Sequence, residues 1–257
     1  MDPTTRQTTI EEANVAHFDK FAQNYDDNPF VNQIAKQVVD LIRNKVALSE
    51  ESTIMLDYAC GTGQISRKSE PFVKKVIGVD ISQGMVDQYN QRASDQAIPP
   101  EKMQAVCIPR LQGDNSDLDG QKFDIIVCAQ AYHHFSDINK VTKDLTNLLK
   151  PGTGRLFIAD LMQYDRGSSS QSEENDGAVP HSHHHHHHYH HHQAQNQHHH
   201  HHPHHNSHTQ SNPIAPIGHH EPFSGPSVAH HGGFTSDQIT TVLESVGLQD
   251  VEFIPNA

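Results

Sequence analysis

The stretch that decides the fold is T-I-M-L-D-Y-A-C-G-T-G, residues 53–63. Residues 53–58 are a short, mostly apolar run with a β-branched pair, which is typical of a buried parallel strand. A turn of small residues, Ala59 to Gly63, follows the run directly. Small residues are used where the backbone must approach a ligand closely, so this turn is the first candidate for a binding element.

A second apolar stretch, Lys75 to Val79, ends on Asp80. The acid therefore lies roughly 20 residues beyond the glycine turn, at the tip of the neighbouring predicted strand, where carboxylates bind the vicinal hydroxyls of a ribose. Together the turn and the acid predict a cofactor that carries a nucleoside. A dinucleotide fingerprint needs a third glycine where Ser66 stands, which argues against the rival class, an NAD-linked oxidoreductase.

The run Asp57-Tyr58-Ala59-Cys60-Gly61-Thr62-Gly63 resembles the first motif, D-x-[GA]-C-G-T-G, of the class I S-adenosylmethionine-dependent methyltransferases. The resemblance is to the small-molecule branch that includes the ubiquinone and menaquinone enzymes. It implies a doubly wound, Rossmann-like α/β fold with a mostly parallel sheet, and S-adenosyl-L-methionine as cofactor. It also implies that Asp57 and the backbone of Ala59, Cys60, Gly61, Thr62 and Gly63 hold the methionine part, and that Asp80 holds the ribose.

Further cofactor contacts follow from the same resemblance. Residues 80–85 resemble the family's D-x-S-x-x-M, which places Ile81 against the adenine and Met85 near the cofactor, although core packing explains Met85 equally well. After a third predicted strand, Met103 to Ile108, the family has an acid that binds the adenine amino group. Asp114 is the favoured candidate, and solvated turn chemistry is the alternative explanation for the acids of this loop.

The N-terminal region is expected to cover the site. The helical spacing of apolar residues predicts a helix over Ile10–Tyr25 with its aromatic side chains on one face. Packing on the core is the simpler interpretation. Residues 17–26, H-F-D-K-F-A-Q-N-Y-D, also resemble the family's lid segment, which makes Phe18, Phe21 and Tyr25 candidates to wall the active site.

A fourth predicted strand, Phe123 to Ala129, is almost unbroken in its apolar character, as expected for a strand covered on both faces. It delivers residues 131–135, A-Y-H-H-F, to the carboxyl edge of the sheet, where open α/β sheets bind ligands. This segment resembles the family's A-x-H-H-F. If the methyl acceptor is a phenol or enol oxygen, His133 or His134 is the candidate general base, with a packing or hydrogen-bonding role as the alternative.

The remaining elements complete the predicted sheet. A helix from Asp137 or Asn139 to Lys150 and a fifth strand, Arg155 to Leu161, continue the alternating pattern. A last helix, capped by Thr235 or Ser236, precedes a predicted sixth strand, Leu248 to Ile254. Members of the family normally add a seventh, antiparallel strand, and here that strand is expected to be missing.

Residues 166–222 are rich in Ser, Asn, Gln and His and hold most of the 25 histidines. Apolar residues are too few to offset chain entropy, so a disordered insert is expected. One interpretation is a tolerated surface repeat. The other is a metal-buffering tract with His183–His188 and His198–His202 as weak sites and no metal in the core. The alternative function is therefore an inactive methyltransferase-like domain with a His-rich, metal-binding loop.

The expected organisation has four parts: a disordered N-terminus (1–9), a cofactor-binding core with N-terminal lid helices (10–165), the insert (166–222), and a C-terminal helix and strand that complete the core (223–257). A second lid helix is predicted to begin at Pro29.

Composition limits the partners. The formal charge of −13 and the lack of a Lys/Arg cluster argue against nucleic-acid binding. The sequence contains no run of 18 or more apolar residues, so no membrane-spanning helix is predicted. Cys60, Cys107 and Cys128 fall in predicted strands or the glycine turn, which favours reduced thiols and a cytoplasmic or nuclear location. A small-molecule substrate is the expected partner.

Overall fold

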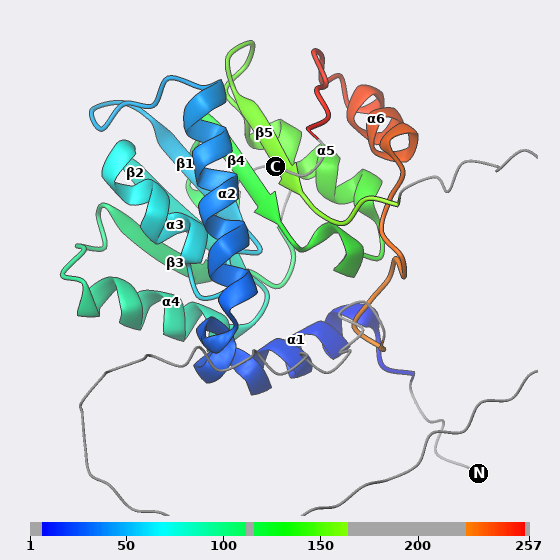
Figure 1. Ribbon diagram of the computed structural model, residues 1–257, viewed down its shortest axis with the longest axis horizontal. Helices are drawn as coiled ribbons and strands as arrows, with labels where there is room; N and C mark the ends of the chain where they lie inside the picture. The colour runs from blue at the N-terminus through cyan, green and yellow to red at the C-terminus, as the bar shows by residue number, and fades with distance from the viewer. Residues whose placement is uncertain (1–6, 112–115, 164–224, 255–257) are drawn as a thin grey trace, which may run out of the picture. The chain divides into compact units, whose positions relative to one another are not determined.

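The computed structural model describes residues 7–111, 116–163 and 225–254 (Figure 1). Several sequence predictions fall outside these residues: Asp114 as the adenine-binding acid, the insert over 166–222 with its two histidine runs, His183–His188 and His198–His202, and most of the N-terminal segment 1–9. No helix in the described ranges is both long enough and apolar enough to cross a membrane.

The described part of the chain is built on a five-stranded, all-parallel sheet in the order β3-β2-β1-β4-β5. The strands are β1 (Ile54–Tyr58), β2 (Lys75–Asp80), β3 (Met103–Cys107), β4 (Ile125–Ala129) and β5 (Arg155–Ala159). The strand order reverses between β1 and β4, which are neighbours in the middle of the sheet. Ligands of such sheets bind at the carboxyl ends of the strands beside this reversal. The predicted doubly wound, parallel α/β fold is confirmed.

The helices begin where the sequence supplies caps. They are α1 (Ile10–Phe21), α2 (Pro29–Lys45), α3 (Gln64–Ser69), α4 (Gln83–Asp95), α5 (Ile138–Leu148) and α6 (Ser236–Ser245). The side chains of Ser82, Asp137 and Thr235 accept hydrogen bonds from the first turns of α4, α5 and α6. Such caps satisfy backbone donors that the helix itself leaves unpaired, so each boundary is encoded locally.

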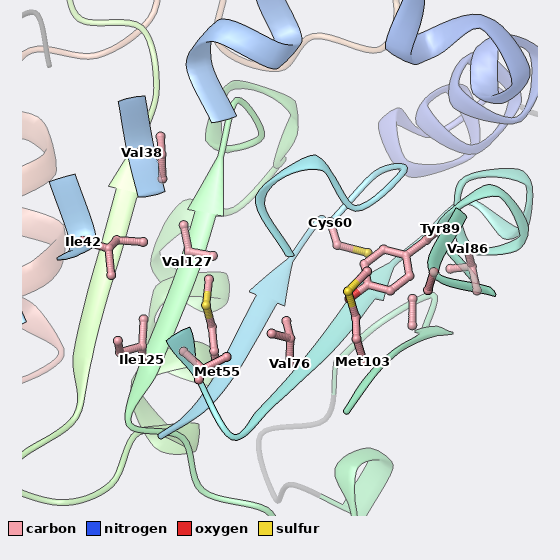
Figure 2. Packing of buried hydrophobic residues seen from close by; sticks show 13 residues of the cluster. Val38, Ile42, Met55, Cys60, Val76, Val86, Tyr89, Met103, Ile125 and Val127 are labelled. Atoms are coloured by element: carbon pink, nitrogen blue, oxygen red, sulfur yellow. The ribbon is translucent and has the colours of Figure 1, made fainter. Parts of the chain in front are cut away.

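Alternation along the strands divides the core between two faces of the sheet. Met55 of β1 packs in a cluster with Val38 and Ile42 of α2 and Tyr89 of α4 (Figure 2). Leu56, the next residue, belongs to a second cluster with side chains of α5. Because successive strand residues point to opposite faces, both faces are apolar and both are covered by helices. The sheet edge is therefore the surface left for a ligand.

The structure differs from the predictions at several element boundaries and in one strand. The helix predicted over Ile10–Tyr25 ends at Phe21 and continues as a 3₁₀ turn, Ala22–Asp27. The predicted sixth strand is wrong, because Leu248–Ile254 forms no strand. Phe253 and Ile254 are 38 % and 37 % exposed, and Glu252 of the same segment forms an ion pair with Lys45 of α2.

Candidate functional site

A cavity lies at the carboxyl ends of β1, β2 and β4. Its walls come from the turn after β1, the tip of β2, the loop after β4 and the N-terminal segment. The predicted cofactor-binding residues that line it are Ala59, Gly61, Asp80, Ile81 and Met85. The predicted lid and catalytic residues that line it are Phe18, Tyr25 and His134. The structure thus brings residues from four separate parts of the sequence around one space.

Three residues of the turn after β1 have a left-handed backbone conformation. Ala59, Gly61 and Gly63 have φ angles of 57°, 52° and 84°. This conformation costs an L-residue roughly 1–2 kcal/mol, so Ala59 is strained and the two glycines are not. A Cβ on Gly63 would lie 2.5 Å from the ring of Tyr89, which makes glycine necessary for packing as well. The turn therefore presents bare backbone to the cavity.

Asp80, at the tip of β2, forms part of the cavity wall and also holds the turn. Its Oδ2 accepts a hydrogen bond from the Gly61 amide at 2.8 Å, and its Oδ1 accepts one from the Ser82 amide at 2.9 Å. Burial raises the pKa of Asp80, while the backbone donors oppose that rise. Each carboxylate oxygen has a second lone pair, so the group can still accept hydrogen bonds from two hydroxyls of a ligand.

Four predicted cofactor-binding residues do not line the cavity: Asp57, Cys60, Thr62 and Gly63. Asp57 is buried and accepts a hydrogen bond from the Ser66 hydroxyl at 2.6 Å. Burial raises the pKa of this carboxyl to about 7. The Thr62 hydroxyl hydrogen-bonds Asp26. In this structure, Asp57 and Thr62 form hydrogen bonds that hold the turn in place on the side away from the cavity.

The two candidate histidines, both in the loop after β4, have different environments. His133 is 3 % exposed, does not line the cavity, and forms a hydrogen bond from Nδ1 to Oδ1 of Asp160 at 2.8 Å. Asp160 also accepts a hydrogen bond from the Tyr132 amide at 2.7 Å. Asp160, just beyond β5, thus fixes the loop in which Gln130 has a left-handed φ of 54°. His134, the next residue, lines the cavity.

The tautomer of His134 is set by its surroundings. Its Nδ1 lies 2.6 Å from the carbonyl oxygen of Ser227, which can only accept a hydrogen bond, so Nδ1 carries the proton. Burial lowers the pKa of His134 to about 4, and the imidazole is therefore neutral at pH 7. Nε2 is left as an acceptor. The ring packs edge-on against Phe18, with ring centroids 5.2 Å apart.

The N-terminal segment forms one wall of the cavity and is anchored by carboxylates. In Figure 1, α1 lies on the side of the sheet toward which the arrowheads of β4 and β5 point. Asp19 accepts hydrogen bonds from the Ser82 hydroxyl at 2.5 Å and the Gly84 amide at 2.9 Å. Asp26 pairs with Arg67 and Arg92, each at 3.0 Å.

The predicted aromatic wall is only partly assembled, because Phe21 is 45 % exposed and does not line the cavity. Asn14 lines it instead, which the sequence analysis missed because apolar periodicity takes no account of an inward-facing amide. Within the described residues, no group of three His, Cys, Asp or Glu side chains could hold a metal ion.

Comparison with known proteins points in one direction. Residues 55–152 match the model of a methyltransferase domain family, a span that includes the glycine turn, Asp80 and His134. An uncharacterized methyltransferase of Schizosaccharomyces pombe is 29 % identical, over 96 % of this chain and 83 % of its own. A ubiquinone biosynthesis O-methyltransferase of Coxiella burnetii is 28 % identical over 62 % of this chain, which spans just under two thirds (65 %) of that enzyme.

The fold is also found among solved structures. A candidate methyltransferase of Bacillus halodurans superimposes with a TM-score of 0.50 and 16 % sequence identity. The match covers 83 % of this chain and 70 % of that one. At this level of identity the likeness shows the shared α/β fold.

Proposed function

We propose that the cavity of this chain, a class I S-adenosylmethionine-dependent methyltransferase, serves methyl transfer to a small-molecule acceptor by in-line displacement. The observation that carries the proposal is that Gly61, Asp80 and His134 line one space. The first two suit the cofactor, and the third suits the group that receives the methyl.

The residues on the cofactor side fit S-adenosyl-L-methionine. Asp80 offers two carboxylate oxygens to the ribose hydroxyls, and Ile81 and Met85 offer apolar surface to the adenine. The left-handed turn at Gly61 leaves room for close approach, since the nearest atom to a Cβ there would be on the Tyr25 ring, 3.8 Å away. When bound, this cofactor supplies a methyl group activated by a sulfonium.

The protein's own contribution is alignment, exclusion of water and acceptance of one proton. The rings of Phe18 and the half-buried Tyr25 line the cavity on the N-terminal side. Holding the reacting groups in line in a closed space supplies most of what such a displacement needs. His134 has its lone pair on Nε2 and can accept a hydrogen bond from the acceptor group.

The proposal is tested with the full chain and methyl-tritiated S-adenosylmethionine. The protein is incubated with a yeast small-molecule extract and, separately, with bulk RNA and with bulk protein. Label is expected in small molecules, and a His134→Phe variant is expected to bind the cofactor while losing most of that labelling. Label confined to RNA or protein, or failure of the wild-type chain to bind the cofactor, would contradict the proposal.

A further inference from the structure

Asn14 is an unusual residue for the inner wall of the lid. It is a polar side chain on α1, only 6 % exposed, and it lines the cavity. Its Nδ2 donates a hydrogen bond to the backbone oxygen of His134 at 3.2 Å. Its Oδ1 is buried and has no hydrogen-bond partner in the described part of the chain.

The orientation of this amide is determined by its neighbour. The backbone oxygen of His134 can only accept a hydrogen bond, so the nitrogen of Asn14 must face it and the oxygen must point elsewhere. A buried acceptor without a donor is unfavourable, and proteins rarely leave one unless a ligand or water completes it. Asn14 Oδ1 is therefore an unsatisfied acceptor on a residue that lines the cavity.

His134 contributes a second acceptor. Because its Nδ1 proton is directed to Ser227, its Nε2 can only accept, and no described residue donates to that nitrogen. The hydrogen bond between Asn14 and His134 joins the two residues across the cavity wall, one from the lid and one from the loop after β4.

We propose that Asn14 and His134 form the recognition wall for the methyl acceptor, and that this wall selects an uncharged molecule bearing hydroxyl or N–H donors. The inference rests on the proposed function and names the substrate class of the same site. Asn14 is the specificity-determining residue, and His134 receives the hydrogen bond from the nucleophile.

The other walls agree with an uncharged ligand. Two cationic side chains, Lys140 and Arg110, line the cavity, and Lys140 is ion-paired with Asp144 at 2.5 Å. An anionic acceptor would have to displace Asp144 from Lys140, and it would also approach the unpaired acceptors of Asn14 and His134. Rings of Phe18, Tyr58 and Phe135 add apolar surface suited to a mainly hydrophobic molecule.

The reaction balances with these residues alone. For a hydroxyl acceptor, a C–O bond forms as the methyl–sulfur bond of the cofactor breaks, and the hydroxyl proton passes to Nε2 of His134 and then to water. Burial keeps the pKa of His134 low, so this imidazole is too weak to remove the proton beforehand. It accepts the proton once the new bond has made the oxygen strongly acidic.

The test compares three ligands that share one ring system. The full chain, saturated with S-adenosylhomocysteine, is titrated calorimetrically with 2-naphthol, with 2-methoxynaphthalene and with 2-naphthoate. The first offers a donor, the second has that donor capped, and the third is an anion. We expect 2-naphthol to bind about 10-fold more tightly than either of the others, since only it satisfies the wall.

Variants locate the effect. Asn14→Leu, Asn14→Ala and His134→Phe should each reduce the preference for 2-naphthol about 5-fold while S-adenosylhomocysteine affinity stays within about 2-fold of wild type. Lys20→Ala, an exposed change on the same helix, should leave the preference intact. Equal binding of the three ligands, including no binding of any, or tighter binding of 2-naphthoate, would overturn the inference. Loss of S-adenosylhomocysteine binding by the wild-type chain would instead refute the proposed function.

Discussion

The Asp80 carboxylate accepts a hydrogen bond from the Gly61 amide at 2.8 Å, so the acid at the tip of β2 holds the turn that follows β1. The two motifs that define the site in the sequence, a small-residue turn and a strand-end acid, are thus physically joined. The shape of the turn and the binding of the cofactor should therefore both depend on the side chain of Asp80.

Gly63→Ala should destabilise the fold strongly. The new methyl would meet the Tyr89 ring at 2.5 Å, and φ at this position is 84°. Strain and overpacking together should lower the free energy of unfolding by about 3 kcal/mol, measured by urea denaturation. Gly120→Ala is the matched control, because φ there is 71° but nothing lies within 4 Å. It should cost only about 1 kcal/mol, and equal losses at both positions would show that packing against Tyr89 plays no part.

Much of this site could be predicted from the sequence because it is encoded locally. The run of apolar residues before Ala59 and the acid after Val79 specify two parallel strands, and parallel strands bring their carboxyl ends to one edge. The start of the last helix, expected at Thr235 or Ser236, is capped by Thr235, since capping involves only the nearest residues.

What could not be predicted depends on long-range contacts. Asn14 and His134 are 120 residues apart in sequence, and no local pattern joins them. Phe21 is exposed and residues 248–254 form no strand, and the apolar pattern alone could not distinguish either outcome from the predicted one. The different environments of His133 and His134 could not be predicted either, because they depend on the position of Asp160, which lies beyond a different strand.

Asp57→Asn should change how stability depends on pH. Burial raises the pKa of Asp57 from 3.8 to about 7, so the folded protein favours the protonated carboxyl. Stability from this group is fully present below pH 3.8 and is lost as the pH rises through 7. The unfolding free energy of the variant minus that of wild type should therefore be larger at pH 8 than at pH 4. The increase should be on the order of 2 kcal/mol. Parallel pH profiles for the two proteins would contradict this account.

His134 should act in the opposite direction. Burial lowers its pKa from 6.5 to about 4, so its contribution to stability is present above pH 6.5 and is lost as the pH falls through 4. Wild-type protein should therefore lose on the order of 2 kcal/mol between pH 7 and pH 4 that a His134→Phe variant does not lose. Thermal unfolding of both proteins across this range measures the difference. Parallel stability profiles for the two proteins between pH 7 and pH 4 would show that the imidazole is solvated.

Asp26→Asn should loosen the lid. The Asp26 carboxylate joins the 3₁₀ turn after α1 to Arg67 and Arg92, and it also accepts a hydrogen bond from Thr62 in the glycine turn. Removing its charge leaves two partly buried guanidinium groups without a counter-charge. Dissociation of S-adenosylhomocysteine, followed by stopped flow, should become about 10-fold faster. Asp27→Asn, an exposed neighbour, should have no effect, and identical rates for both variants would argue against a closed lid.

The most direct measurement is a calorimetric titration of the full chain with S-adenosylmethionine and, separately, with NAD, repeated on Asp80→Asn. An amide at this position would set a donor against the backbone donor of Gly61 or Ser82. The account predicts saturable binding of S-adenosylmethionine, no binding of NAD, and at least about a 10-fold loss of affinity in the variant, with Asp95→Asn behaving as wild type. Binding of NAD in preference, or an Asp80→Asn variant with unchanged affinity for S-adenosylmethionine, would contradict it.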